Sequence, residues 1–323
     1  MRKLLLAALT AALAGIGSAA AQYPTHPITM IVPFAPGGPT DVTARIIGEH
    51  MSRTLGQNFV IENVAGAGGT IGSTRTMRAT PDGYTIQMGQ MGTHAGAVGL
   101  YPKLAYKPDM DFEPIGRVVD QAILVFGRKD FPPADFKEFI PYVKANAGKL
   151  NVGHAGVGSI SHFTCLLLDS ILGVKPTMVP FGGAAPAINA LMGGQTDYMC
   201  DSISAPVQQV QAGTVKGYAV ATPERNPALP NIPTTKEAGL PEFQAFGWYA
   251  LFAPKGTPKP VLDTLTAALD KALDDPTVRK RFADLACDIP DKSKRGQAAL
   301  AAFVQSEIAR WTPIIKAANI QVE

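Results

Sequence analysis

The sequence predicts an α/β protein built from two lobes. Short apolar segments alternate with segments of helical periodicity along most of the chain, which is typical of parallel sheets covered by helices. The chain has 323 residues, more than one hydrophobic core usually organises. Two long runs, 118–128, which is mostly apolar, and 246–254, which is uninterrupted, can each leave one sheet and enter another. We therefore expect the chain to cross between two lobes at these runs.

The first 21 residues are predicted to be a cleavable export signal. Arg2-Lys3 form a basic start, Leu4 to Ile16 an apolar run, and Ala19-Ala20-Ala21 a small-residue cleavage site. The apolar run is shorter than the roughly 20 residues that span a bilayer. The mature chain is expected to begin at Gln22 and to be exported to the periplasm as a soluble protein.

Composition argues against several classes of partner. The formal net charge of +3 includes Arg2 and Lys3, so the mature chain is nearly neutral, and nucleic acid is not expected as a partner. No CxxC or HExxH pattern suggests a metal site, and no cofactor is expected. The glycine run 63–72 does not have the spacing of a dinucleotide fingerprint, so close backbone packing is favoured there. Cys165 and Cys200 are compatible with a disulfide or with two buried thiols.

The elements follow one another in a regular order. Strands are expected at 28–34, 59–62, 84–88, 150–153, 178–180, 197–200 and 216–221. Helices are expected at 42–55, 160–172, 260–273, 276–285 and 297–316. Three further helices are expected to start within or directly after 63–72, at Pro186 and at Ser204 or Pro206. The last long helices carry apolar stripes that should face the core, at Val261, Leu265, Leu269 and Leu273, then at Leu300, Phe303, Val304, Ile308, Trp311 and Ile315.

The stretch 31–47 carries the first indication of function. An apolar strand breaks at Gly37-Gly38 and becomes a helical pattern, with Pro39 suited to the first helical position. The free amide groups and the dipole of such a helix start attract anions. Three further junctions share this design and contain neither Lys nor Arg: Gly158-Ser159, Gly182-Gly183 and Asp201–Ser204. Together they predict a carboxylate site without a salt bridge, although ordinary helix caps would produce the same pattern.

The chain resembles the Bug family, the extracytoplasmic solute-binding receptors of tripartite tricarboxylate transporters. The resemblance spans the whole predicted mature chain and consists of many short motifs in order. They include Tyr23-Pro24-x-His26-Pro27-Ile28, Val32-Pro33-Phe34-x-Pro36-Gly37-Gly38-x-x-Asp41, Asn63-x-x-Gly66-Ala67-Gly68-Gly69, Gly92-Thr93-His94-Ala95, Val179-Pro180-Phe181-x-Gly183 and Phe252-Ala253-Pro254-x-Gly256-Thr257-Pro258.

The resemblance implies a Venus-flytrap fold of periplasmic type II topology, with two crossing strands and a ligand between the lobes. The implied division is 22–121 for the first part of lobe 1, 122–245 for lobe 2 and 246–323 for the rest of lobe 1. The crossings should lie near Val119–Ile123 and Ala245–Trp248.

The resemblance also assigns ligand-binding residues on two facing loops. In lobe 1 they are Phe34, Ala35, Gly37, Gly38, Thr40, Asp41, Gly92, Thr93 and His94. In lobe 2 they are His154, Ala155, Gly158, Ser159, Ser161, His162, Phe181, Gly183, Ala184, Asp201 and Ser202. Small polar residues are common in the family where this chain has His154, so His154 is a candidate for choosing the ligand. The alternatives are a solvent-facing or capping role for His154, a helix cap for His162, and cleft-wall packing for Phe34 and Phe181.

The function implied is a monomeric periplasmic receptor that captures a small carboxylate and delivers it to a membrane permease. Aliphatic di- or tricarboxylates, aromatic carboxylates and amino acids all remain open as ligands. One alternative is a sensor that presents the ligand to a signalling partner. Another is an α/β enzyme, but no GxSxG elbow or P-loop supports it.

Overall fold

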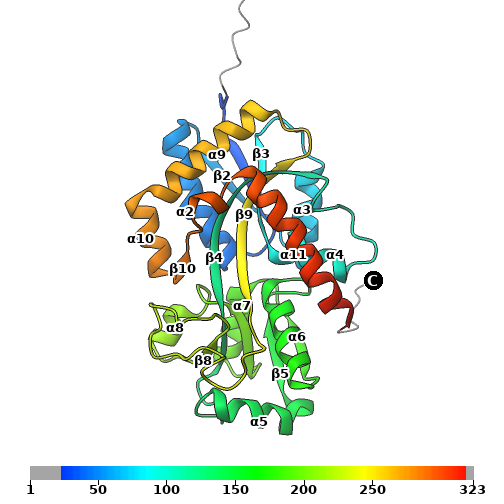
Figure 1. Ribbon diagram of the computed structural model, residues 1–323, viewed down its shortest axis with the longest axis vertical. Coiled ribbons are helices and arrows are strands. Elements are labelled where there is room, and N and C mark those ends of the chain that lie inside the picture. Colours follow the sequence, from blue (N-terminus) through cyan, green and yellow to red (C-terminus); the bar gives the residue numbers. More distant parts are fainter. Residues whose placement is uncertain (1–22, 318–323) are drawn as a thin grey trace, which may run out of the picture.

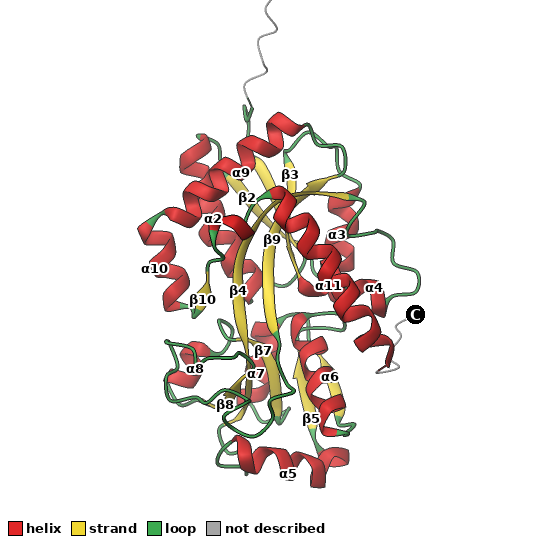
Figure 2. Ribbon diagram, viewed as in Figure 1, coloured by secondary structure: helices red, strands yellow, loops and turns green. Residues whose placement is uncertain are grey.

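The computed structural model describes residues 23–317, which form two lobes one above the other (Figure 1). Each lobe is a sheet with helices packed around it (Figure 2), so the predicted two-lobed α/β class is confirmed. The predicted export signal, 1–21, lies outside the described residues. Within 23–317, no helix is both long and apolar enough to cross a membrane.

The lobe 1 sheet has the strand order β2-β1-β3-β9-β4. Its strands are β1 (Ile28–Val32), β2 (Phe59–Asn63), β3 (Thr85–Gln90), β9 (Phe246–Pro254) and the first part of β4 (Phe112–Arg128), with the short β10 (Cys287–Asp288) paired to β4. The pairs β1–β2 and β1–β3 are parallel, whereas β9 is antiparallel to both β3 and β4. The carboxyl ends of β1 and β3 therefore lie at one edge, which faces lobe 2.

The lobe 2 sheet repeats this design. Its strands are the second part of β4, β5 (Asn151–His154), β6 (Thr177–Pro180), β7 (Tyr198–Ser202) and β8 (Val215–Val220). β5 is parallel to β6 and β7, and β4 is antiparallel to β7 and β8. The carboxyl ends of β5, β6 and β7 point toward lobe 1.

One continuous strand belongs to both sheets. β4 pairs with β9 as far as Ala122, and from Ile123 it pairs with β7 and β8. The chain returns through Ala245, whose amide donates to the carbonyl of Ala221 before β9 begins. Figure 2 shows β4 and β9 running side by side through the middle of the molecule. The residue limits given above for the lobes stay a prediction.

The helices agree broadly with the sequence patterns. They are α2 (Pro39–Leu55), α3 (Thr70–Met77), α4 (Ala97–Leu100), α5 (Phe136–Asn146), α6 (Ile160–Leu172), α7 (Ala184–Met192), α8 (Val207–Gln211), α9 (Lys259–Asp274), α10 (Pro276–Asp284) and α11 (Gln297–Ala317). The sequence did not predict α5, in which Pro141 interrupts the helical pattern. α7 begins at Ala184 and not at Pro186, which lies in its first turn.

The apolar stripes of α9 and α11 face the core as predicted, except at their margins. Leu265, Leu269, Leu300, Val304 and Trp311 are buried. Val261, Phe303 and Ile308 are only partly buried. Each of these lies at the edge of its stripe, where the helix surface turns toward solvent.

A buried glutamate joins α11 to the strand that connects the lobes. The carboxylate of Glu307 accepts hydrogen bonds from the indole nitrogens of Trp248 in β9, at 3.0 Å, and of Trp311, at 3.2 Å. Arg310 lies on the same helix, with Nη1 3.4 Å from the other carboxylate oxygen. The Glu307 carboxylate therefore contacts one strand residue, Trp248, and two residues of its own helix, Trp311 and Arg310. Its hydrogen bond to Trp248 anchors α11 on β9.

We predict that Glu307→Ala destabilises the protein, because it leaves two buried indole N–H groups unpaired. The expected loss in the free energy of unfolding is about 2–4 kcal/mol, measured by urea denaturation. Glu307→Gln keeps an acceptor oxygen and should lose less. Gln305→Ala changes an exposed residue of the same helix and should be nearly neutral. Equal stability of Glu307→Ala and Gln305→Ala would show that the contact is dispensable.

Candidate functional site

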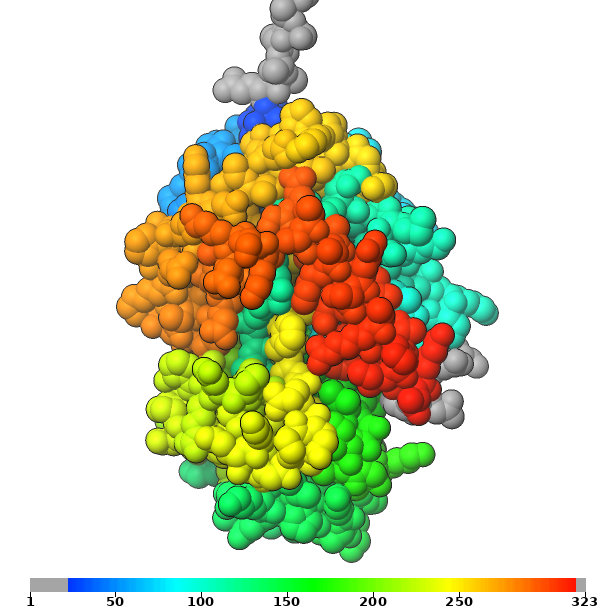
Figure 3. All heavy atoms as spheres, in the orientation of Figure 1, coloured from blue at the N-terminus to red at the C-terminus, as the bar shows by residue number. Residues whose placement is uncertain are grey.

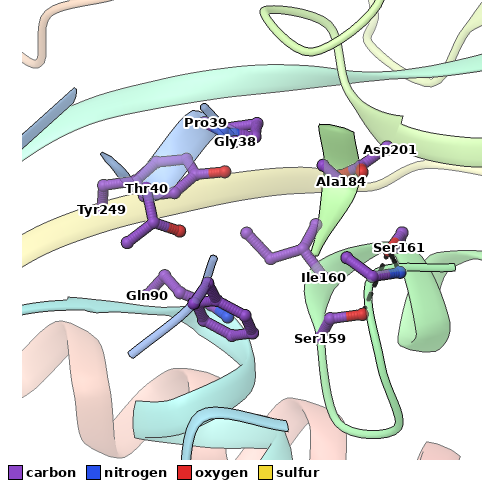
Figure 4. Close-up of a pocket in the computed structure, with 12 residues that line it drawn as sticks. Gly38, Pro39, Thr40, Gln90, Ser159, Ile160, Ser161, Ala184, Asp201 and Tyr249 are labelled. Carbon is purple, nitrogen blue, oxygen red and sulfur yellow. Dashed lines mark hydrogen bonds between the residues drawn. The ribbon is translucent and has the colours of Figure 1, made fainter. Parts of the chain in front are cut away.

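A small cavity lies between the lobes, at the facing edges of the two sheets (Figure 4). Lobe 1 contributes Phe34, Gly38, Pro39, Thr40, Gln90 and Tyr249, and lobe 2 contributes Ala155, Ser159, Ile160, Ser161, Ala184 and Asp201. In the space-filling view the two lobes touch, and a furrow between them shows parts of β4 and β9 (Figure 3). The cavity itself is small, about 20 Å³, which is room for about one water molecule, so a larger ligand requires the lobes to move apart.

Three helix N-termini converge on this cavity from both lobes. Gly38 is the N-cap of α2, Ser159 of α6 and Gly183 of α7, and residues of the first turn of each helix line the cavity. Each terminus presents unpaired amide groups and the positive end of a helix dipole. The fourth predicted junction is different, because α8 begins only at Val207 and has five residues. The structure therefore brings together three of the four predicted helix starts.

The cavity wall is mostly apolar, with a few polar groups, and it carries no side-chain cation among the described residues. Among the described residues, the twelve that line it include neither Lys nor Arg. The hydroxyls of Ser159 and Ser161 lie 3.0 Å apart, and they accept hydrogen bonds from the amides of His162, at 3.2 Å, and Ala155, at 2.8 Å. Tyr249 presents a hydroxyl from β9, 2.8 Å from that of Ser202. An anion here would be held by amides, hydroxyls and dipoles.

Asp201 is the one acidic side chain in the wall. It lies on β7 and is 3% exposed. Its Oδ1 accepts from the amide of Ser202 at 2.7 Å, whereas Oδ2 has no hydrogen-bond partner among residues 23–317. Burial raises the pKa of Asp201 to about 7, against the opposing effect of the Ser202 amide.

Asp41 is not among the cavity-lining residues and instead holds the glycine loop. Its Oδ2 accepts from the amide of Gly37, at 2.9 Å, and from Nε of Arg45, at 2.9 Å. Its Oδ1 accepts from Nη2 of Arg45 and Nδ2 of Asn63, both at 2.9 Å. Burial works to raise the pKa of Asp41, but these hydrogen bonds outweigh it and leave the pKa below its usual value. The side chain thus fixes the start of α2.

The segment Gly92-Thr93-His94 lies beneath the cavity wall in lobe 1. The ring of His94 stacks on Phe252 with centroids 3.8 Å apart, and its Nδ1 is 2.9 Å from the hydroxyl of Thr93. Burial lowers the pKa of His94 to about 3, so it is neutral near pH 7. None of the three residues is among those that line the cavity.

His154 and His162 pack against each other in lobe 2, with ring centroids 4.6 Å apart. Nδ1 of His162 accepts from the amide of Gly158 at 3.2 Å, which orders the loop before α6. Burial lowers the pKa of His154 to about 4 and that of His162 to about 3. Neither ring is among the cavity-lining groups. The role of His154 in ligand choice stays a prediction.

Eight of the predicted residues line the cavity, and the other twelve are not among its lining residues. The eight are Phe34, Gly38, Thr40, Ala155, Ser159, Ser161, Ala184 and Asp201. Of the rest not yet placed, Ala35 and Gly37 approach Gly183 and Ala185 across the cleft, and Phe181 lines a neighbouring space that also touches Phe34.

Four lining residues were not predicted: Pro39, Gln90, Ile160 and Tyr249. Gln90 is a polar residue at the carboxyl end of β3, where ligands of parallel sheets bind, so the sequence did contain a signal for it. Tyr249 lies within an apolar run and resembles a core residue in the sequence. Ile160 and Pro39 simply follow the N-caps of their helices.

The lobes touch through backbone at several glycines. A Cβ at Gly92 of lobe 1 would overlap with the carbonyl oxygen of Gly158 in lobe 2, and one at Gly68 would overlap with that of Val157. The hydroxyl of Tyr101 lies 3.0 Å from both the Val157 and the Ala67 carbonyl oxygens, which belong to different lobes. The glycine run of 63–72 therefore serves close packing, in this case between the lobes.

Metal and disulfide chemistry find no support in the described part of the chain. Within 23–317, no group of three or more His, Cys, Asp or Glu residues is placed to hold a metal ion. Cys165 and Cys200 are buried free thiols, with the Cys200 amide donating to Sγ of Cys165 at 3.1 Å. Of the two possibilities left open by the sequence, the structure thus has the thiols.

The fold and the cavity define a two-lobed solute-binding receptor. The pattern of the tripartite tricarboxylate transporter family receptor, TctC, matches residues 43–320, and the chain belongs to this family. The family is one of binding receptors and not of enzymes, and it is the family that the sequence motifs indicated.

Solved structures support the assignment. MatC from Rhodopseudomonas palustris with bound malate is 49% identical, with a TM-score of 0.88, covering 91% of this chain and 100% of that chain. The periplasmic binding protein BugD is 43% identical, with a TM-score of 0.89, covering 93% and 100%. Rpa4515 of R. palustris with adipate is 30% identical, with a TM-score of 0.88, covering 93% and 100%.

We predict that Gly92→Ala weakens ligand binding at least tenfold by keeping the lobes apart. Gly92 has no positive φ, so the substitution adds no backbone strain, but its Cβ would overlap with Gly158 of the other lobe. Small-angle scattering should show no compaction when ligand is added. Gly182→Ala places a Cβ in open space on a facing loop and serves as the control. Normal affinity and compaction in Gly92→Ala would mean that the lobes need not approach this closely.

Proposed function

We propose that this receptor binds a small carboxylate between its lobes, with a carboxylate group at the three converging helix N-termini. The observation that carries the proposal is that α2 of lobe 1 and α6 and α7 of lobe 2 all begin at one cavity. The malate and adipate in two similar structures support a small aliphatic di- or tricarboxylate as the class of ligand, with aromatic carboxylates as the next class to test.

Helix dipoles and hydroxyl groups are sufficient to bind a carboxylate without a cationic side chain. A helix N-terminus stabilises a nearby anion by about 0.3–1 kcal/mol, and by about 2 kcal/mol where partly buried. The hydroxyls of Thr40, Ser159 and Ser161 offer hydrogen bonds to carboxylate oxygens in the same place. Three termini and these hydroxyls thus supply several kcal/mol without a cationic side chain.

The two lobes must close for the site to be complete. α2 belongs to one lobe and α6 and α7 to the other, so the full set of amides surrounds the ligand only in the closed form. The ligand therefore stabilises closure by its differential affinity for that form. We further propose that the closed receptor acts as a monomer and passes its ligand to the permease of a tripartite transporter in the periplasm. Loss of carboxylate uptake on deletion of the gene would test the transport role.

We predict that Gly38→Asp abolishes binding, because it places a negative charge where the ligand carboxylate should lie. Gly38→Ala is the matched control: the Cβ makes an ordinary 3.6 Å contact with Ala184, and φ is −83°. Binding is measured by thermal shift against a carboxylate library and then by calorimetry.

The expected result is at least a hundredfold loss of affinity in Gly38→Asp and less than a tenfold loss in Gly38→Ala. Equal affinity of the two variants would remove the start of α2 from the site. Absence of any stabilising carboxylate for the wild-type protein would contradict the proposed function itself.

A further inference from the structure

An acidic side chain in the wall of an anion site is an unusual arrangement. Asp201 lines the cavity beside Ala184 at the start of α7 (Figure 4). It is 3% exposed, and Oδ2 has no hydrogen-bond partner among residues 23–317. A buried polar atom without a partner costs free energy, so this oxygen is suited to meet a group of the ligand.

Within residues 23–317, no cationic side chain compensates an ionised Asp201. The titratable groups that act on it are Cys165 from α6, Cys200 from β7 and Tyr249 from β9. Burial raises the pKa of all three, so they are uncharged near pH 7. The residues that face Asp201 from β4 and α7, Leu124 and Ala184, carry no charge.

A ligand carboxylate and an ionised Asp201 cannot share this cavity at low cost. Two carboxylates in contact in a dry site retain one proton between them, because like charges at that separation raise the pKa of one partner. The three helix termini favour the charged form of the ligand, whereas Asp201 accepts only from the Ser202 amide. The proton therefore belongs on Asp201.

We propose that the receptor binds its carboxylate ligand with Asp201 in the protonated form, that Oδ2 of Asp201 donates this proton as a hydrogen bond to the ligand, and that at alkaline pH the receptor therefore takes up one proton with each ligand. In that case a proton leaves a solvent or buffer acid and forms an O–H bond with Oδ2 of Asp201, and no other covalent bond changes. This inference rests on the proposed function and identifies the chemical state in which the site binds its ligand.

The pH dependence of ligand affinity is set by the pKa of Asp201 in the ligand-free protein. Burial places the pKa of Asp201 at about 7, so below this pH the proton is already bound and affinity should be level. Above it, Asp201 must gain a proton on binding, so affinity should fall about tenfold per pH unit. The pKa values of His154 and His162 are lowered to about 4 and about 3, so the two histidines do not change charge between pH 6 and pH 9.

Calorimetry in two buffers of different ionisation enthalpy tests the proposal. The probes are malate, succinate and adipate, and the one that binds the wild-type protein most tightly is used at pH 8. We expect uptake of nearly one proton per ligand, against nearly none at pH 6. Absence of uptake at pH 8, or equal affinity at pH 6 and pH 9, would overturn the inference while leaving the proposed function intact.

Two variants separate Asp201 from other buried acids. Asp201→Asn keeps a hydrogen-bond donor but cannot titrate, so it should bind with affinity independent of pH and without proton uptake. Asp169→Asn is the matched control, because burial raises the pKa of Asp169 to about 7 as well, but its Oδ1 accepts from Tyr198 at 2.7 Å and it is not in the cavity wall. The control should keep the proton uptake of the wild-type protein.

Other outcomes have distinct meanings. Proton uptake that persists in Asp201→Asn would overturn the assignment to Asp201. Affinity that rises with pH, or a loss in Asp201→Asn confined to malate, would show that ionised Asp201 accepts from the ligand hydroxyl, which also contradicts the proposal. If none of the three probes binds the wild-type protein, the proposed dicarboxylate function fails, and the inference fails with it.

Discussion

Three helices from two separate lobes begin at one small cavity, and the described residues that line it include neither Lys nor Arg. The positive ends of α2, α6 and α7 repel one another weakly when the lobes approach. An anion between them turns this repulsion into attraction. Recognition and closure are therefore one electrostatic event, and most other features of the molecule serve to bring these three termini together accurately.

The strand β4 and the glycines provide this accuracy. β4 is hydrogen-bonded in both sheets and changes partners between Ala122 and Ile123, so the carboxyl ends of β5 and β7 are directed at those of β1 and β3. Asp41, with Arg45 and Asn63, fixes the loop before α2. Gly68, Gly92 and Gly158 then let the facing loops approach to backbone distance.

Much of this could be predicted from local sequence. The strand, glycine turn and Pro39 at the start of α2 are encoded within a few residues, and α6 begins at Ile160, directly after the predicted junction Gly158-Ser159. The convergence of three termini was not encoded locally, because it depends on how the lobes are oriented. Tyr249 has the sequence context of a core residue and reaches the cavity only through the course of β9. The sequence did not predict α5, because Pro141 lies in the middle of the segment and proline usually ends a helix. In the folded protein the helix continues through Pro141.

Backbone contact between the lobes has a consequence for how such a receptor can diversify. The surfaces that meet at Gly68, Gly92 and Gly158 are peptide groups, which are the same whatever side chains lie elsewhere. The residues that touch the ligand are a different set, around the first turns of α2, α6 and α7. Substitutions around the ligand can therefore change which organic acid is bound without altering how the lobes close, provided that positions 68, 92 and 158 remain glycine. Closure of the lobes and choice of the ligand therefore depend on different residues of the same cleft.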